Sequence, residues 1–258
     1  MLHYVALTTG SCGNCYIFYD GKTSFIVDVG VTWKKLSTEL EMHDIPLSSL
    51  SAVFLTHVHP DHAKGVGVVQ RKTGLPVFVS SVCMRDGKTE MERLKMEKKG
   101  VFPFSYGDSI SVGDFSVVPF RTSHDSPGSS GYFIDHREGR IFLMTDTGRI
   151  PEEAWNYARV SDVEFIESNY DENMLENGPY PVWLKNRVRG EYGHLSNEDA
   201  ISFASDTSRH GDQIYFIHVS ENNNDTSLIK EAIVRRIPSG IFCKACERGE
   251  MFEGFLGD

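Results

Sequence analysis

The stretch LTHVHPDHAKG, residues 55–65, places three histidines and an aspartate within six positions, at His57, His59, Asp61 and His62. It follows an apolar segment, SAVFLT, that is typical of a buried strand. Neutral imidazoles and carboxylates are ligands that a borderline divalent ion prefers, and ligands two residues apart at a strand end point the same way. The stretch therefore predicts a metal site at the end of a strand.

Three more ligand-type residues follow other predicted strands. His124 comes after FSVVPF, Asp146 comes after IFLM, and His218 closes QIYFIHVS. Each alone is most simply a cap or a satisfied polar group. Together with the cluster they indicate a shared rim at the carboxyl ends of the strands, where packed sheets present side chains to a ligand.

Seven ligand groups are too many for one tetrahedral ion and suit two ions that share a carboxylate. Zinc, manganese or iron would be compatible with these ligand types. A water between two such ions is expected to lose its proton near neutral pH and act as the nucleophile. Asp28, after the strand TSFIV, is expected to orient a ligand histidine. The expected ligands, with Asp146 bridging, are His57, His59 and His124 on one ion and Asp61, His62 and His218 on the other.

The composition predicts a folded chain with a substantial core. Of its 258 residues, 40% are hydrophobic and 24% are charged, so we expect one domain over 1–258. No apolar run approaches the roughly 18 residues of a membrane span, and the first residues lack a signal-peptide pattern. The five cysteines suit reduced thiols. We therefore expect a cytoplasmic protein without a membrane partner.

Apolar runs and helical periodicities alternate along the chain. An α/β fold follows, with two mixed sheets packed together and helices outside, a four-layer αββα sandwich. The turn at Asp20 and Gly21 predicts a hairpin. The expected strands are 3–9, 15–20, 23–30, 51–56, 76–80, a block of short strands over 101–144, 163–168, 213–220 and, as the last strand, 240–246. The expected helices are 32–42, 62–74, 82–99, a region ending at 189, 196–208 and 225–237.

The motifs together resemble a known family. Residues 28, 56–62, 124, 146 and 218 match the five motifs of the metallo-β-lactamase fold superfamily, and GHLSNEDA followed by IHVSENNN is similar to its ribonuclease Z-like nucleases. The resemblance is most specific to the YycJ/WalJ-type exonucleases. It implies a metal-dependent phosphodiesterase that degrades DNA, single-stranded or from 5′ ends. The motifs that run in the same order are TTGSCGN, THVHPDHAKGVGV, SHD, MTDTG, ESNYDENML, GHLSNEDA and HVSENNN.

Phosphodiester hydrolysis also needs a proton for the departing alkoxide. His194, in EYGHLSNEDA, is the expected acid because the other seven groups are assigned, and Asp61 is expected to be both ligand and essential to catalysis. Glu167, at the end of VEFIE, is expected to hold His194 protonated. The resembling nucleases use the equivalent histidine in this way. Two alternatives remain: His194 caps a helix, or it replaces His218 as the seventh ligand.

Several polar and basic residues are expected to contact phosphate. They are Asn14 in the turn GSCGN, the polar residues Ser220, Asn223 and Asn224, and the basic residues Lys185, Arg187 and Arg189. Ordinary turn chemistry and a solvated helix face explain these residues equally well. The formal charge of −10 disfavours loose adsorption to nucleic acid, so bound metals would have to supply the local positive charge.

Other functions use parts of the same pattern. A hydrolase of a small substrate, such as a cyclic nucleotide, thioester or lactone, would need the metals but not His194 and Glu167. An RNA nuclease or a non-catalytic metal-bound scaffold are further alternatives. The pairs Cys12/Cys15 and Cys243/Cys246 could form a zinc site only if the chain ends met, so buried or reduced thiols are preferred. No motif indicates the oligomeric state.

Overall fold

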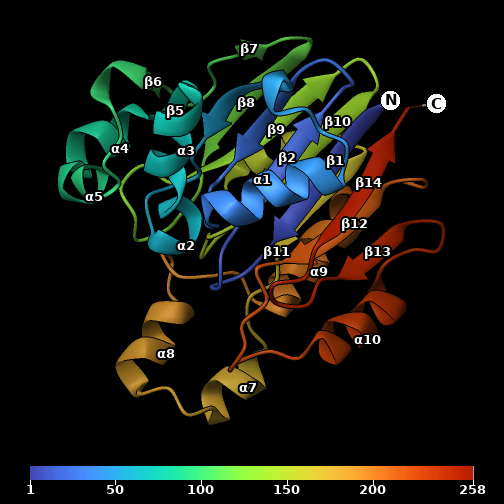
Figure 1. Cartoon of the computed structure of the whole chain (residues 1–258). Coiled ribbons are helices and arrows are strands. Elements are labelled where there is room, and N and C mark those ends of the chain that lie inside the picture. The colour runs from blue at the N-terminus through green and yellow to red at the C-terminus, as the bar shows by residue number, and fades with distance from the viewer. Residues whose placement is uncertain (258) are drawn as a thin grey trace.

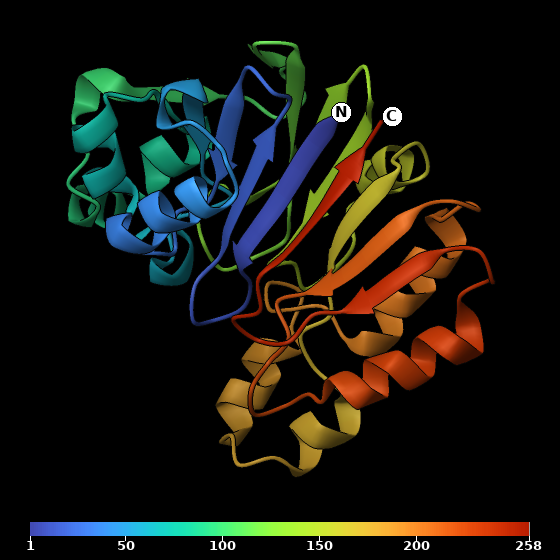
Figure 2. The same ribbon diagram turned by 45° about the vertical axis from the view of Figure 1, so that its right-hand side comes forward.

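Two seven-stranded sheets lie face to face at the centre of the molecule, and helices cover the outer face of each (Figure 1; Figure 2). The computed structural model describes residues 1–257. The aromatic core between the sheets includes Phe18, Phe54 and Phe165, all nearly inaccessible to solvent. The predicted four-layer sandwich of two mixed sheets is confirmed.

The first sheet combines the N-terminal strands with one strand from the opposite end of the chain. Its helices pack through apolar residues such as Leu36 and Val69. In spatial order its strands are β14 (Phe252–Leu256), β1 (Leu2–Thr8), β2 (Cys15–Tyr19), β3 (Ser24–Val27), β4 (Leu50–Phe54), β5 (Val77–Ser80) and β6 (Val101–Phe104). The helices beside it are α1 (Trp33–Met42), α2 (Pro60–Ala63), α3 (Val66–Thr73), α4 (Ser81–Asp86) and α5 (Lys88–Arg93), with 3-10 turns at Leu47–Ser49 and Lys98–Gly100.

The second sheet is antiparallel at one end and parallel at the other. Its strands are β13 (Phe242–Ala245), β12 (Gln213–Ile217), β11 (Val163–Glu167), β10 (Gly139–Met144), β9 (Ser130–His136), β8 (Phe115–Arg121) and β7 (Ile110–Val112). The helices that cover it are α6 (Glu152–Ala158), α9 (Asn197–Thr207) and α10 (Thr226–Arg236). The short helices α7 (Glu172–Asn177) and α8 (Val182–Val188) project from the end of the molecule where β11 and β12 finish (Figure 1).

Two predicted helices are broken by glycines. The helix expected over 62–74 is divided into α2 and α3 because the Gly65 amide donates to Val29 O at 2.9 Å, joining the bend to the loop after β3. A Cβ at Gly65 would lie 2.1 Å from Val31 O, so only glycine allows this approach. The helix expected over 82–99 is divided at Gly87, a poor helix former, and α5 ends at Arg93.

The prediction that 240–246 forms the last strand is also wrong. Five residues of β14 follow it and pair antiparallel with β1 (Figure 2). The segment FEGFL has a glycine at its centre, which weakens strand propensity. Gly254 is required there because the Tyr4 hydroxyl lies 2.0 Å from the position of a Cβ. Within residues 1–257, no helix has the length and apolar character needed to cross a bilayer.

Candidate metal centre and active site

The first sheet supplies a compact group of ligand residues at one rim. His57 and His59 follow β4, and His59 is the N-cap residue of α2, which Pro60 begins. One turn of helix then turns His62 inward, where its side chain is fully buried, while Asp61 is 24% exposed. The end of β4 and the first turn of α2 therefore place all four side chains at the carboxyl end of β4, where the sequence predicts a metal site.

The second sheet supplies the remaining ligand residues from separate strand ends. His124, Asp146 and His218 follow β8, β10 and β12. Asp146 and His218 adopt positive φ angles of 53° and 55°, and Asp28 after β3 has 62°. Such backbone costs on the order of 1 kcal/mol or more for a residue other than glycine and persists only where surrounding contacts enforce it. Strain at three site residues was not foreseen from the sequence.

The seven expected ligands converge in two groups. The ligand atoms of His57, His59 and His124 lie within 4.8 Å of one another, and so do those of Asp61, His62 and His218. Asp146 lies between the groups: its Oδ2 is 2.9 Å from His62 Nε2 and its Oδ1 is 3.5 Å from His124 Nε2. The structure thus brings together the same two sets, with Asp146 between them, that the sequence predicts.

The donor set fits divalent cations. Within residues 1–257, His57 Nε2 and His218 Nε2 are buried nitrogens without a hydrogen-bond partner, which is costly unless a cation occupies the space. Burial lowers the pKa of His57 well below its usual value, and it also lowers the pKa values of His59 and His124. These imidazoles are therefore neutral, the form that binds metals.

The second group lies in a strongly negative environment. Burial alone would raise the pKa of Asp146, but the neighbouring His218 and His62 hold it well below its usual range. Burial disfavours the charged form of His62, yet the surrounding carboxylates, led by Asp146, raise its pKa well above normal. Carboxylates that stabilise positive charge on His62 in this way would also attract a divalent cation to the same place.

Asp28, which is expected to orient a ligand histidine, contacts His62. Its Oδ2 accepts a 2.6 Å hydrogen bond from His62 Nδ1, which leaves His62 Nε2 directed at Asp146. Thr56 fixes the carboxylate by donating its amide to Oδ1 at 2.8 Å and its hydroxyl to Oδ2 at 2.7 Å. The sequence reasoning missed Thr56, although it directly precedes the histidine cluster.

Glu167 holds His194, and it also contacts His218. Its Oε1 is 2.7 Å from His194 Nδ1 and 3.0 Å from His218 Nδ1, and Oε2 accepts the Thr147 amide at 2.9 Å. Burial raises the pKa of Glu167, but the two histidines, His194 foremost, outweigh it and lower the pKa. The sequence left open the alternative that His194 replaces His218 as the seventh ligand. The structure is compatible with this alternative because the Glu167 carboxylate contacts both rings.

A cleft of about 340 Å³ opens over these groups. Ser220 and Asn223 line it together with His194 and Arg187. Asn223 is 1% exposed; its Nδ2 donates to Ser220 Oγ at 3.4 Å, and its buried Oδ1 has no hydrogen-bond partner within residues 1–257. Of the expected phosphate contacts, these residues lie where a substrate could reach them.

Two other expected phosphate contacts do not agree with the structure. Asn14 is 0% exposed, and its Nδ2 lies 2.9 Å from His62 Nε2, the ring nitrogen that also contacts Asp146. Asn224 is 7% exposed and exchanges hydrogen bonds with Asn197 and Ser168. The alternative that the sequence left open, ordinary turn chemistry, explains both residues. Their side-chain amides support loops rather than a ligand.

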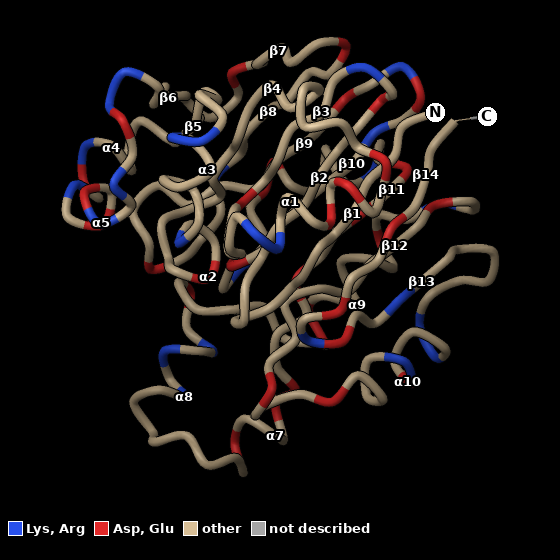
Figure 3. The backbone as a smooth tube through the Cα atoms, viewed as in Figure 1, with Lys and Arg blue, Asp and Glu red and all other residues tan. Residues whose placement is uncertain are grey.

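The three basic residues of α8 and its C-cap differ in their surroundings. Arg187 lines the cleft and binds Asp125 Oδ2 at 2.6 Å. Arg189 instead pairs with the Glu176 carboxylate, and Lys185 donates to the Glu176 main-chain carbonyl. Figure 3 shows basic segments along α8 beside acidic segments around α7. Only Arg187 is brought to the metal centre.

The cysteines form no disulfide within residues 1–257. Cys243 packs toward the helices outside the second sheet, whereas Cys246 lies in the core between the sheets. Burial raises the pKa of the Cys243 thiol to about 12. The preference for reduced, largely buried thiols agrees with these positions, except that Cys12 is exposed.

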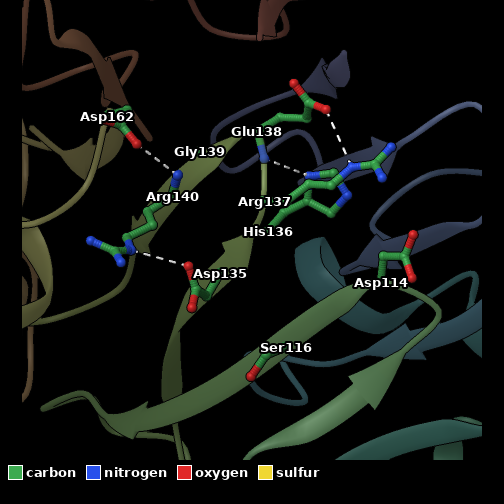
Figure 4. A pocket seen from close by; sticks show the side chains of 9 residues that line it. All are labelled: Asp114, Ser116, Asp135, His136, Arg137, Glu138, Gly139, Arg140 and Asp162. Carbon is green, nitrogen blue, oxygen red and sulfur yellow. Dashed lines mark hydrogen bonds and ion pairs between the residues drawn. The ribbon is translucent and has the colours of Figure 1, made fainter.

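A second hollow, of about 420 Å³, lies near the turn between β9 and β10 (Figure 4). Its charges are paired with one another: Arg140 Nε binds Asp135 Oδ1 at 3.0 Å, and Arg137 Nε lies 3.3 Å from Glu138 Oε1. It contains none of the converging ligands described above. The cleft at the strand ends is therefore the candidate active site.

Comparison with known proteins identifies the family. The family model described as "Beta-lactamase superfamily domain" matches residues 24–219. The chain belongs to the beta-lactamase superfamily. Within this superfamily it is 30% identical to "Exodeoxyribonuclease YycJ" of Bacillus anthracis over 253 residues, 98% of this chain and 94% of the relative. It is 29% identical to "Exodeoxyribonuclease WalJ" of Streptococcus pneumoniae D39 over 91% of this chain and 87% of the relative. The resemblance to YycJ/WalJ-type proteins is confirmed.

Solved structures agree with the fold of this superfamily. The metallo-beta-lactamase fold protein YhfI of Bacillus subtilis superposes with a TM-score of 0.70 at 16% identity, covering 98% of this chain and 99% of that protein. A diphosphatase of the PhnP family gives 0.67 at 18% identity, with 100% and 99% covered. These structures therefore agree with the metallo-β-lactamase fold, which implies divalent metal ions. The family match and the exodeoxyribonuclease relatives identify the chain as a hydrolase.

Proposed function

We propose that this hydrolase is a dinuclear-metal phosphodiesterase, and that it degrades DNA as a 5′-to-3′ exonuclease releasing 5′ nucleotides. The observation that carries the proposal is the convergence of two ligand groups with a carboxylate-held histidine in one cleft. The names of the YycJ and WalJ relatives support DNA as the substrate class.

Seven residues would hold the ions. When bound, zinc or manganese (or iron) would supply Lewis-acid chemistry, activating water and neutralising charge on phosphate oxygens. His57, His59 and His124 would hold one ion, and Asp61, His62 and His218 the other, with Asp146 shared. Asp28 would keep His62 Nε2 directed at the metals.

The remaining residues would move the proton and hold the substrate. His194 is 15% exposed, so its ring can reach a substrate in the cleft. The Glu167 carboxylate would accept a hydrogen bond from His194 Nδ1 and so keep the proton on that nitrogen. His194 would donate a proton from its other nitrogen to the departing alkoxide, and Glu167 would stabilise the imidazolium. Ser220, Asn223 and Arg187 would contact phosphate or sugar groups.

Degradation of single-stranded DNA labelled at either the 5′ or the 3′ end, with Mn²⁺ or Zn²⁺ added, tests this proposal. We expect the wild type to release 5′ mononucleotides from the 5′ end and Asp61→Ala to be inactive. The matched control is His210→Ala, which removes an exposed histidine that belongs to neither ligand group. Absence of DNA and RNA cleavage, with hydrolysis of bis(p-nitrophenyl) phosphate or a thioester instead, would reassign the site to a small substrate.

We also propose that residues 1–258 form one domain and act in the cytoplasm, where DNA would be available. Limited proteolysis that yields a stable fragment would contradict the first proposal. Recovery of the protein in the membrane or exported fraction would contradict the second.

A further inference from the structure

A second group of metal-type ligands lies outside the active site, where β1, β14 and the end of α1 meet. Glu253 Oε2 is 2.8 Å from His3 Nε2 and 2.9 Å from His43 Nδ1. The ligand atoms of the three residues lie within 4.8 Å of one another. The histidine side chains are 12% and 11% exposed, and that of Glu253 is 45% exposed, so the group is half-buried but open to ions.

The pairing of the two chain ends creates this group. His3 of β1 lies opposite Phe255 of β14, so Glu253, two residues along, shares its face of the sheet. The His3 ring is fixed by stacking on Phe255 at a centroid distance of 4.3 Å. His43 is the C-cap residue of α1, and its amide donates back to Glu39 O at 3.0 Å.

The far side of His43 argues for a cation. Its Nε2 lies 3.3 Å from Met251 Sδ, a weak acceptor, and 4.0 Å from Glu39 Oε2, a buried carboxylate oxygen with no hydrogen-bond partner within residues 1–257. If neutral His43 used an Nδ1 proton to bind Glu253, the lone pair of Nε2 would face this carboxylate. A metal on Nδ1 moves the proton to Nε2, where Met251 Sδ can accept it and the Glu39 carboxylate lies nearby, as in the carboxylate–histidine–metal arrangement of many sites.

We propose that His3, His43 and Glu253 form a zinc site that clips β14 to β1 and α1. Two imidazoles and one carboxylate are a common zinc ligand set that leaves a fourth position for water. The site shares no residue with the proposed catalytic centre and does not depend on the proposed function.

Such a clip would stabilise the segment that returns from the second sheet to the first. Just before β14, the Gly249 amide donates to Thr9 O at 2.9 Å, and the Thr9 hydroxyl accepts the His218 amide at 2.9 Å. β14 has only five residues and lies at the edge of its sheet, so it gains more from an added cross-link than a central strand.

The first test is zinc content at pH 8 after dialysis against a chelator of micromolar affinity. We expect the wild type and the exposed-histidine control His210→Gln to retain one more zinc ion per chain than His3→Gln/His43→Gln. A His57→Ala/His59→Ala variant should keep the clip zinc while losing zinc from the catalytic centre. Equal zinc in the wild type and the His3→Gln/His43→Gln variant would overturn the proposal.

The second test is amide hydrogen exchange over residues 252–256. Removal of zinc should accelerate exchange there severalfold in the wild type but not in His3→Gln/His43→Gln, and β9 should be unaffected in both. Glu253→Gln replaces the double variant if that protein does not fold. Exchange in β14 that is indifferent to zinc, or loss of all zinc to the chelator of micromolar affinity, would overturn the proposal and show that hydrogen bonds alone hold Glu253.

Discussion

Two carboxylate–histidine pairs lie on opposite sides of the active site, one from each sheet. Asp28 and His62 are 2.6 Å apart, and Glu167 and His194 are 2.7 Å apart. Both side chains of the first pair are fully buried, whereas His194 is 15% exposed and lines the cleft. The same two chemical groups at the same separation can therefore position a ligand or exchange a proton, and accessibility separates the two roles.

The strongest test of this difference is His194→Ala. Loss of a general acid lowers kcat by about 10²–10⁴-fold, and we expect metal content to be unchanged because His194 is not an expected ligand. Single-turnover DNA cleavage and metal analysis of the same preparation would measure both. A loss of metal together with activity would make His194 a ligand and remove the contrast between the pairs.

Asp28→Asn should show the opposite pattern. Replacing the buried partner of a ligand histidine weakens metal affinity by about 10–100-fold. Excess metal should then restore much of the activity, which it cannot do for His194→Ala. Titration of activity against Zn²⁺ or Mn²⁺ checks this, with Asp44→Asn on the surface as the control. If metal affinity is unchanged, Asp28 does not position His62.

A third buried carboxylate, without a histidine, sharpens the comparison. Glu164 is on the same strand as Glu167, and burial raises its pKa to about 8 from 4.5, with only Thr207 donating to it. Because the folded pKa is the higher one, this contribution to stability is lost as pH rises from about 4.5 to about 8. Between pH 5 and pH 8 the wild type should lose roughly 2–4 kcal/mol of unfolding free energy relative to Glu164→Gln.

Urea unfolding of both proteins at the two pH values measures this difference. The matched control is Glu41→Gln, a substitution on the exposed surface of α1. Parallel pH profiles for the wild type and Glu164→Gln would show that Glu164 is ionised in the folded protein.

The smallest effect is expected for Arg187→Gln. Its guanidinium binds Asp125, whose Oδ1 lies 3.5 Å from Nε2 of the expected ligand His124, so Arg187 is beside the candidate metal centre but is not an expected ligand. Losing one partly exposed phosphate contact should raise KM for DNA severalfold, about tenfold at most, with kcat nearly unchanged. Lys185→Gln, which removes a contact with Glu176, is the control and should leave KM unchanged. A similar rise in KM for both would point to general charge attraction.

Most of the metal centre could be predicted from the sequence because its parts are local. The histidine cluster is contiguous, and His124, Asp146 and His218 each follow an apolar strand, so their position at one rim needs only the αββα arrangement. The pairing of His194 with Glu167 was predicted on chemical grounds. The burial of Asn14 beneath His62 was not, because an asparagine in a glycine-rich turn has the same local sequence whether it faces solvent or the core.

By itself, the sequence determined which ligand-type residues follow which strands, since strand periodicity and residue type are properties of short segments. Only the tertiary structure decided the contacts between distant segments. They include the pairing of β14 with β1 and the helix break at Gly65, where the Gly65 amide donates to Val29 O. They also include the contacts of Glu167 with both His194 and His218, and the group formed by His3, His43 and Glu253. The physical reason is that each such contact depends on the packing of two elements far apart in the chain, and no local pattern encodes that packing.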